Sequence, residues 1–152
     1  MYGVDINDGV GRDVGSGDFN NDGADDVVIG ATGDDRVIPG QGKVHIVYGP
    51  ISVSLFDLSD SNITFDGISA GDGFGGAVDS GDFNNDGIDD LIIGARFAEG
   101  AGETTNNEGE IYIFYGPINE NNANITFYGI DAGDHAGSVS YTHLTLPTTP
   151  YV

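Results

Sequence analysis

The sequence GDFNNDGADD occupies residues 17–26, and an almost identical sequence, GDFNNDGIDD, occupies residues 81–90. Counted from the first Asp of each copy, oxygen-bearing side chains fall at positions one, three, five and nine, and a Gly falls at position six. Calcium is a hard cation that prefers six to eight oxygen ligands at about 2.3–2.6 Å. A Gly permits the positive φ that a tightly curled loop requires. The spacing therefore predicts two calcium-binding loops.

The two predicted calcium sites use equivalent residues. Each takes side-chain oxygens from three Asp and one Asn, and a backbone carbonyl from the residue at position seven. The first site comprises Asp18, Asn20, Asp22, Ala24 and Asp26, and the second comprises Asp82, Asn84, Asp86, Ile88 and Asp90. A single loop of this kind is also compatible with a solvated turn, because Asp, Asn and Gly are common turn residues. Two copies in matching context favour metal binding.

The charge of the chain supports this interpretation. The 152 residues include 25 acidic and 4 basic side chains, which gives a formal net charge of −21. Twenty of the acidic residues are Asp and five are Glu, and the shorter Asp suits tight metal loops and turns. A charge of this sign excludes nucleic acid as an expected partner. Much of the negative charge is therefore interpreted as a means of binding calcium.

Location is inferred from cysteine usage and calcium chemistry. The chain has no Cys, which fits an intracellular protein or an exported bacterial protein that metal stabilises. Extracellular calcium modules bind at about 10⁻⁴–10⁻³ M, which cytosolic calcium does not reach. We therefore expect a secreted, extracellular or cell-surface protein of bacterial origin. With no signal peptide or membrane-spanning apolar run, the chain is expected to be an internal piece of a longer protein, without membrane insertion.

An internal repeat organises the chain. The two predicted loops are offset by 64 residues (82 − 18). Downstream, GKVHIVYGP at residues 42–50 matches GEIYIFYGP at 109–117, and NITF at 62–65 recurs at 124–127. The Asn-Ile-Thr triplets match a glycosylation acceptor, but their recurrence favours a structural role. The expected units are residues 1–64, 65–126 and the start of a third at 127–138.

Each repeat is predicted to contain four short strands and no helix. In the second and third strands apolar residues occupy both faces, so both faces are expected to be covered. A β-propeller provides this cover, because each four-stranded blade lies between two neighbours. The prediction is an all-β fold of antiparallel propeller blades, with strands at 11–17, 26–31, 44–48 and 63–65, then 75–81, 90–95, 111–115 and 125–127.

Short motifs beside the loops resemble a known family. Phe74-Gly75 and Gly94-Ala95-Arg96, with Val10-Gly11 and Gly30-Ala31-Thr32 in the first copy, resemble the FG-GAP repeat of integrin α-chain propellers. The resemblance covers residues 1 to about 138, with Val10, Thr32 and Arg96 departing from the pattern. It implies a seven-bladed propeller whose calcium loops join strands one and two. It also implies that partners dock on the opposite face, through residues 32–41, 67–73 and 96–108.

The end of the chain departs from the repeat. A third loop is expected to open at His143, but residues 139–148 read VSYTHLTLPT, without Gly or Asp. Residues 139–152 are therefore predicted to be a non-native tail, translated from a sequencing adapter. A diverged native tail is the alternative.

Other functions were weighed against these residues. An EF-hand needs a Glu at position twelve and flanking helices, but that position is Ile29 or Ile93 within an apolar strand. No Gly-x-Ser-x-Gly motif is present, and His45 is expected to pack between blades rather than act as a base. We expect no reaction from this segment. Its expected role is calcium-stabilised adhesion or binding of a protein or glycan, beside further blades. The alternatives are an accessory propeller of a secreted hydrolase or lyase, and a purely architectural repeat.

Overall fold

The computed structural model describes residues 9–33, 39–52, 57–100, 107–119 and 123–138. The predicted tail at 139–152, and parts of two predicted ligand loops at 34–38 and 101–106, lie outside the described residues. Two sheets and one 3-10 turn make up the regular structure of the described part. The elements are β1 (Val10–Gly17), β2 (Asp26–Ala31), β3 (Lys43–Val47), η1 (Leu58–Asp60), β4 (Ile63–Asp66), β5 (Phe74–Gly81), β6 (Asp90–Ala95), β7 (Glu110–Phe114) and β8 (Ile125–Tyr128).

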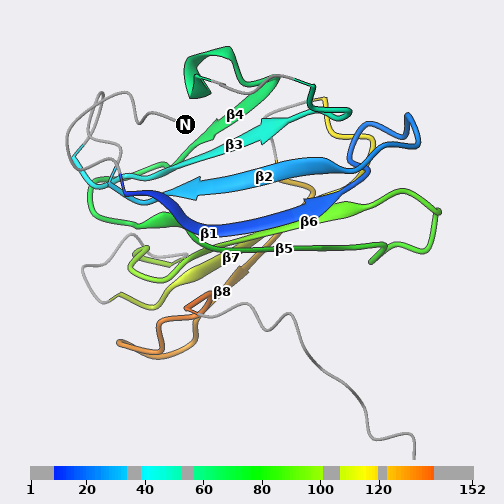
Figure 1. Cartoon of the computed structure of the whole chain (residues 1–152). Coiled ribbons are helices and arrows are strands. Elements are labelled where there is room, and N and C mark those ends of the chain that lie inside the picture. Colours follow the sequence, from blue (N-terminus) through cyan, green and yellow to red (C-terminus); the bar gives the residue numbers. More distant parts are fainter. Residues whose placement is uncertain (1–8, 34–38, 53–56, 101–106, 120–122, 139–152) are drawn as a thin grey trace, which may run out of the picture.

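Both sheets have four antiparallel strands in chain order, β1-β2-β3-β4 and β5-β6-β7-β8. Strands β1 and β5 contact each other, and the two sheets diverge from there toward β4 and β8 (Figure 1). This radial arrangement is that of neighbouring propeller blades, with β1 and β5 innermost. The predicted all-β fold of four-stranded antiparallel blades is confirmed, and every strand lies within two residues of its expected position. Seven blades remain a prediction.

The sheets extend slightly beyond the limits set by the repeat. Strand β4 continues to Asp66 and β8 to Tyr128, whereas the expected units ended at residues 64 and 126. The cause is hydrogen bonding, because Lys43 of β3 pairs with Asp66, and Glu110 of β7 pairs with Tyr128. Strand pairing, rather than the period of the repeat, decides where a blade ends.

The core lies between the two blades. One face of the first sheet presents Val28, Val44, Ile46 and Phe65, all buried against the second sheet. Contacts between aromatic rings cross the interface, with the centroids of Phe65 and Phe114 4.4 Å apart. Burial of such side chains contributes about 1.5–3 kcal/mol each, so the interface holds much of the stability of the pair. The second blade supplies Leu91, Ile93, Tyr112 and Phe114 to the same cluster.

Glycines let the two backbones approach closely at the inner strands. A Cβ at Gly30 of β2 would lie 2.0 Å from the carbonyl oxygen of Gly75 in β5. The same approach recurs after the second blade, where a Cβ at Gly94 would lie 2.1 Å from the carbonyl oxygen of Gly137. Residues 136–137 therefore lie against the second blade as residues 74–75 lie against the first. Close backbone contact is a repeated feature of how one unit follows another.

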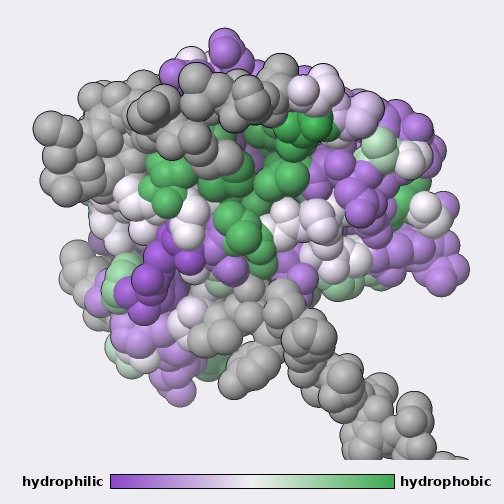
Figure 2. Space-filling model, viewed as in Figure 1, coloured by the Kyte–Doolittle hydropathy of each residue, from purple (hydrophilic) through white to green (hydrophobic). Residues whose placement is uncertain are grey.

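Equivalent aromatic residues of the two blades differ in exposure, depending on whether a neighbouring blade covers them. Phe19 is 0% exposed and Phe65 is 3% exposed, whereas their equivalents Phe83 and Phe127 are each 51% exposed. The difference arises because the second blade covers Phe19 and Phe65 of the first blade. Hydrophobic surface also lies over the middle of the β1–β4 sheet (Figure 2). Exposed apolar area of this kind is typical of interaction surfaces.

Substituting Gly30 tests the close approach of the blades. Gly30→Ala is expected to lower the free energy of unfolding by about 1–3 kcal/mol, because the new methyl group overlaps the Gly75 carbonyl. Urea unfolding followed by circular dichroism measures the change. Gly81→Ala in β5 is the control, since its nearest contact is the exposed ring of Phe83 at 3.3 Å, which can move aside. Equal losses in the two variants would contradict the packing assigned to Gly30.

Candidate calcium-binding loops

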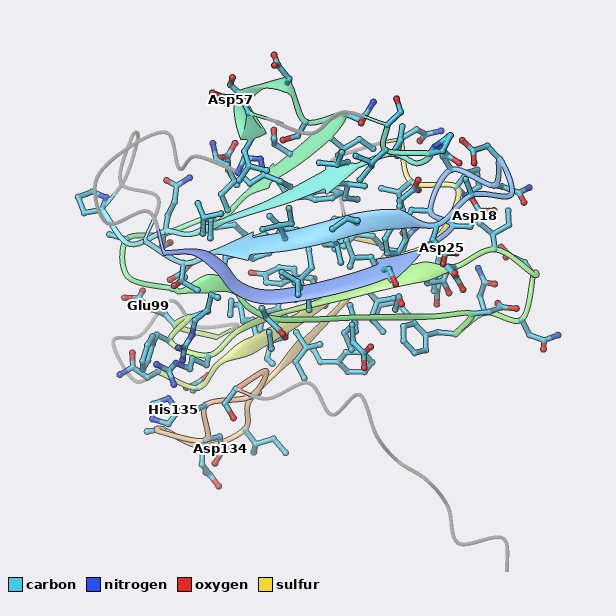
Figure 3. The ribbon with its side chains drawn as sticks, in the orientation of Figure 1. Asp18, Asp25, Asp57, Glu99, Asp134 and His135 are labelled. Atoms are coloured by element: carbon cyan, nitrogen blue, oxygen red, sulfur yellow. The ribbon has the colours of Figure 1, made fainter. Side chains whose placement is uncertain are left out.

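The two predicted calcium loops connect β1 to β2 and β5 to β6. They lie at the same end of the molecule, where Figure 3 labels Asp18 and Asp25. Glu99, Asp134 and His135 lie at the opposite end, where β2 and β6 end (Figure 3). The expected placement between the first and second strands of each blade is therefore confirmed.

The first loop curls around the carboxylate of Asp18. Its two oxygens accept hydrogen bonds from the backbone N–H groups of Asp22 (3.0 Å) and Gly23 (2.9 Å). The side-chain oxygen of Asn20 also accepts from the Asp22 N–H, at 2.9 Å. Two residues adopt positive φ, Asn21 at 60° and Gly23 at 86°. The Gly at position six thus has the conformation that the sequence predicted for it.

The second loop repeats this geometry. The carboxylate of Asp82 accepts from the N–H groups of Asp86 and Gly87, both at 2.9 Å. Asn84 accepts from Asp86 at 2.9 Å, and φ is 61° at Asn85 and 89° at Gly87. Two sequences 64 residues apart therefore fold into the same loop.

The Asp at position nine has a different setting from the others. Asp26 is fully buried, and its two oxygens accept from the N–H groups of Phe19 (3.0 Å) and Gly49 (2.8 Å). Asp90 accepts in the same way from Phe83 (2.8 Å) and Gly116 (2.9 Å). Each carboxylate thus ties the start of its loop to the segment that follows the third strand.

The Gly of each Tyr-Gly-Pro motif belongs to this arrangement. The sequence shows that the motif recurs but does not reveal its contact with the loop. A Cβ at Gly49 would lie 2.4 Å from the carbonyl oxygen of Asp25, and one at Gly116 would lie 2.6 Å from that of Asp89. The recurrence of Gly-Pro in both copies was the signal for a shared contact, but its partner was not evident from the sequence.

A hydrogen bond across the blade interface links the two loops. The side chain of Asp89, at position eight of the second loop, accepts from the N–H of Asp18 at 2.9 Å. The N–H of Ile118 donates to the carbonyl of Phe19 at 2.7 Å, beside the buried Phe19 ring. The first loop is therefore held by the second blade as well as by its own strands.

Electrostatic interaction among the carboxylates is visible at Asp26. Burial raises the pKa of Asp26 above the usual range for Asp, and the negative charges of Asp22 and Asp18 raise it further. Hydrogen bonds from Gly49 and Phe19 act in the opposite direction. Asp18 and Asp22 are thus close enough for their negative charges to disfavour the charged form of Asp26. A cation among them would relieve this repulsion.

The donor set fits calcium in chemistry. Every predicted side-chain ligand offers oxygen, and each carboxylate oxygen of Asp18 and Asp26 accepts one N–H, so lone pairs remain for a metal. Ala24 and Ile88 lie at position seven, where only the backbone carbonyl is a ligand candidate. In the part of the chain that the structure describes, however, no three acidic or His side chains gather as a metal cluster. Binding would therefore require the loop carboxylates to draw together.

Sequence comparison agrees with the geometry. The sequence model of the FG-GAP repeat matches residues 10–47 and 74–114, which is more than half of the chain. The chain belongs to the FG-GAP repeat family. The two matched segments begin at the first strand of each blade and end with its third strand.

Proteins of similar sequence are much longer than this chain. The phosphatidylinositol-glycan-specific phospholipase D of Mus musculus is 39% identical over 66% of this chain, and that of Dictyostelium discoideum is 32% identical over 91%. Integrin alpha ina-1 of Caenorhabditis elegans is 34% identical over 42% of the chain. The chain spans 12%, 17% and 6% of the lengths of these three proteins.

A second group of acids lines a pocket between the blades of the FG-GAP pair. Asp72, Glu99 and Glu110 line about 200 Å³ together with Tyr112. Burial raises the pKa of Asp72, and the charges of Glu110 and Glu99 raise it further, against a hydrogen bond from the Ser69 N–H. The Tyr112 hydroxyl is hydrogen-bonded to Glu110, and burial raises its pKa strongly.

The imidazole of His45 also has a hydroxyl partner. Its Nδ1 lies 2.8 Å from Oγ of Ser61, a pairing that resembles a base beside a nucleophile. His45 is 3% exposed, however, and the Ser61 hydroxyl also donates to the carbonyl of Leu58. The pair thus stabilises the segment between η1 and β4, as expected for a structural histidine.

Two substitutions in the first loop compare the contribution to stability of the buried carboxylate, Asp26, with that of an exposed one, Asp22. In chelator-treated protein, Asp26→Ala is expected to lower the free energy of unfolding by up to about 2–6 kcal/mol. The buried N–H of Phe19 and the partly buried N–H of Gly49 lose their acceptor, at up to about 1–3 kcal/mol each. Asp22→Ala is expected to cost less, since Asp22 is exposed. Urea unfolding measures both. A loss at Asp22 as large as that at Asp26 would contradict the role assigned to the buried carboxylate.

The stability contributed by Asp72 should depend on pH. Its pKa is raised in the folded state above the ordinary 3.8, so the folded protein binds the proton more tightly than the unfolded chain. This contribution is present at low pH and is lost as pH rises from about 3.8 through the folded pKa. Asp72→Asn should therefore gain stability relative to the native chain between pH 3 and pH 7 in urea unfolding, and exposed Asp60→Asn should gain less. A constant difference between Asp72→Asn and the native chain would refute this.

Proposed function

We propose that each FG-GAP loop binds one calcium ion and that calcium stabilises a propeller used for binding outside the cell. The observation that carries the proposal is the duplicated loop, with the same donors, the same hydrogen bonds and the same positive φ values. A solvated turn has no need of three carboxylates whose charges oppose one another. The residues assigned to calcium are those predicted from the sequence.

The ligand residues of each loop would have different roles in binding calcium. Asp26 is already fixed by two N–H groups and Asp90 by three, so they would serve as the rigid side of each site. Asp22 and Asp86 are exposed and would turn inward. Bound calcium would supply the positive charge that offsets the three carboxylates. The bond from the Asp18 N–H to Asp89 would then pass the added rigidity of one loop to the other blade.

The opposite end of the propeller is the proposed binding end. There the described segments 39–41, 67–73 and 96–100 meet: the N–H of Gly71 donates to the carbonyl of Pro39, and the N–H of Phe97 donates to the carbonyl of Asp72. The expected partner is a protein or glycan, as one relative is named an integrin alpha. Further blades would cover the exposed faces that carry Phe83 and Phe127. In the described residues no helix is long and apolar enough to cross a membrane.

A second candidate function is supported by the relatives themselves. Proteins named phosphatidylinositol-glycan-specific phospholipase D match this chain over 66% of its length or more. The chain would then be an accessory propeller of a longer secreted enzyme whose catalytic residues lie elsewhere. Assay of the full reading frame for release of glycan-anchored proteins distinguishes this role from adhesion.

Calcium should stabilise the chain measurably. If each site binds at about 10⁻⁴–10⁻³ M, about 10 mM calcium should raise the free energy of unfolding by about 1.4–2.7 kcal/mol per site. Thermal unfolding with and without calcium, in about 0.15 M salt to screen unspecific attraction, measures the effect. The same concentration of magnesium is the ionic control. No shift at millimolar calcium would refute the proposal.

Removing one site should leave the other. Asp86→Ala is expected to halve the number of ions bound in a calorimetric titration, because it alters the second loop and leaves the Asp18–Asp26 loop intact. Asp60→Ala is the matched control, since it removes an exposed Asp outside both loops. Two sites retained in Asp86→Ala would count against the assignment of this ligand.

A further inference from the structure

The few positive charges of the chain are unevenly distributed. Only four of the 152 residues are Lys or Arg, and two of them, Arg12 and Arg96, line the same pocket. The pocket has a volume of about 210 Å³ and lies between the blades, at the end opposite the calcium loops. Gly40, Gly71, Gly73 and Gly76 form much of its wall.

Arg96 is held in a defined position. It directly follows β6, is half-buried, and its guanidinium carbon lies 4.2 Å from the centroid of the Phe97 ring. The Phe97 ring packs edge-on against His135 with centroids 5.6 Å apart, and Nδ1 of His135 lies 3.0 Å from the carbonyl oxygen of Arg96. Stacking on an aromatic face leaves the planar edge of a guanidinium available for hydrogen bonds.

Arg12 reaches the same pocket from β1. The carboxylate of the neighbouring Asp13 accepts hydrogen bonds from the N–H groups of Val14 (3.0 Å) and Val78 (2.9 Å). Within the described residues neither Arg12 nor Arg96 forms an ion pair, whereas Lys43 pairs with Asp66 at 2.8 Å. Among the described residues that line this pocket there are two guanidinium groups and no carboxylate, in a chain with 25 acidic residues.

This arrangement has a chemical consequence. Two like charges at one pocket repel each other, and an anion between them removes that repulsion. Arg presents a fork of donors that matches the oxygens of carboxylate, sulfate or phosphate. The glycine walls carry no side chains that would fill the space. A volume of about 210 Å³ is below the range of about 300–1,000 Å³ for drug-sized ligands, and so suits one charged group of a larger molecule.

We propose that this pocket binds an oxyanion group, a carboxylate or a sulfate, of an acidic ligand such as an acidic glycan. The inference deepens the proposed binding role by naming the ligand's chemistry, but it does not require calcium to be bound. The net charge of −21 repels anions in general. Any saturable binding of a small anion must therefore arise from a local site.

The arginine side-chain N–H signals in nuclear magnetic resonance provide the test. The chain has three Arg, so three Nε–H signals are expected, and substitution to Gln assigns those of Arg12 and Arg96. The full chain is titrated with sodium sulfate and separately with sodium acetate, at constant ionic strength. We expect saturable shifts of both assigned signals. A preference for one probe distinguishes a tetrahedral dianion from a planar carboxylate as the fitting group.

The variants provide the matched comparison. Arg96→Gln is expected to weaken binding of the preferred anion by about tenfold or more, as loss of a charge-assisted hydrogen bond predicts. Arg12→Gln, at an exposed position, should weaken it without disturbing the fold. Lys43→Gln changes the net charge equally but lies outside the pocket, and should leave binding unchanged. Linear, unsaturable shifts, or equal losses in Lys43→Gln, would overturn the proposal.

The outcome is separable from that of the calcium proposal. The anion titration is run with and without calcium, and we expect saturable binding in both conditions. Loss of stabilisation by calcium with intact anion binding would refute the calcium sites alone. Failure of both probes to bind in calcium-loaded, folded protein would refute the anion pocket alone.

Discussion

The buried carboxylate at position nine of each loop is the interaction on which the rest of the structure depends. Asp26 joins the N–H of Phe19, at the start of the loop, to that of Gly49, beyond β3. Burying a charge is costly unless hydrogen bonds compensate it, and here two backbone donors do so. The arrangement fixes the loop relative to the sheet before any metal is considered. It also places a third carboxylate near Asp18 and Asp22, whose charges raise its pKa, and this crowding of carboxylates is the reason for proposing a cation here.

Because the loop is repeated, its hydrogen bonds also join neighbouring blades. Because Asp89 accepts from Asp18 and Ile118 donates to Phe19, the loop of one blade is completed by the next. The inner strands approach through Gly30 and Gly75, where no side chain fits between the backbones. Each blade thus supplies one side of an interface. The face of the second blade that carries Phe83 and Phe127 is exposed because, within the described residues, no third blade packs against it. A propeller follows from this incompleteness, since only further blades of the same design provide the missing sides.

Much of the fold could be predicted because each strand and loop occurs twice in the sequence, so each pattern could be recognised from two copies. The loop spacing located β1 and β2, and short apolar runs that recur in both copies located β3 and β7. The Asn of each Asn-Ile-Thr triplet was also expected to be structural, and the Asn62 and Asn124 side chains accept from the N–H groups of Tyr48 and Tyr115. Contacts that join distant segments could not be predicted, because the local sequence around one residue does not indicate which distant residue it contacts. The bonds of Gly49 to Asp26 and of Asp18 to Asp89 are of this kind, as is the meeting of Arg12 with Arg96.

The separation of charge along the blades follows from the same topology. In an antiparallel blade the β1–β2 connection lies at one end, and the β2–β3 connection lies at the other. Carboxylates placed in the first connection therefore gather at one end in every blade, as Asp18 and Asp82 do. Basic residues that begin β1 or follow β2 and its equivalent β6, such as Arg12 and Arg96, gather at the opposite end. The acidic loops stabilise the blades at a distance from the arginines, so a propeller with a high negative charge can still present a positive pocket to a ligand.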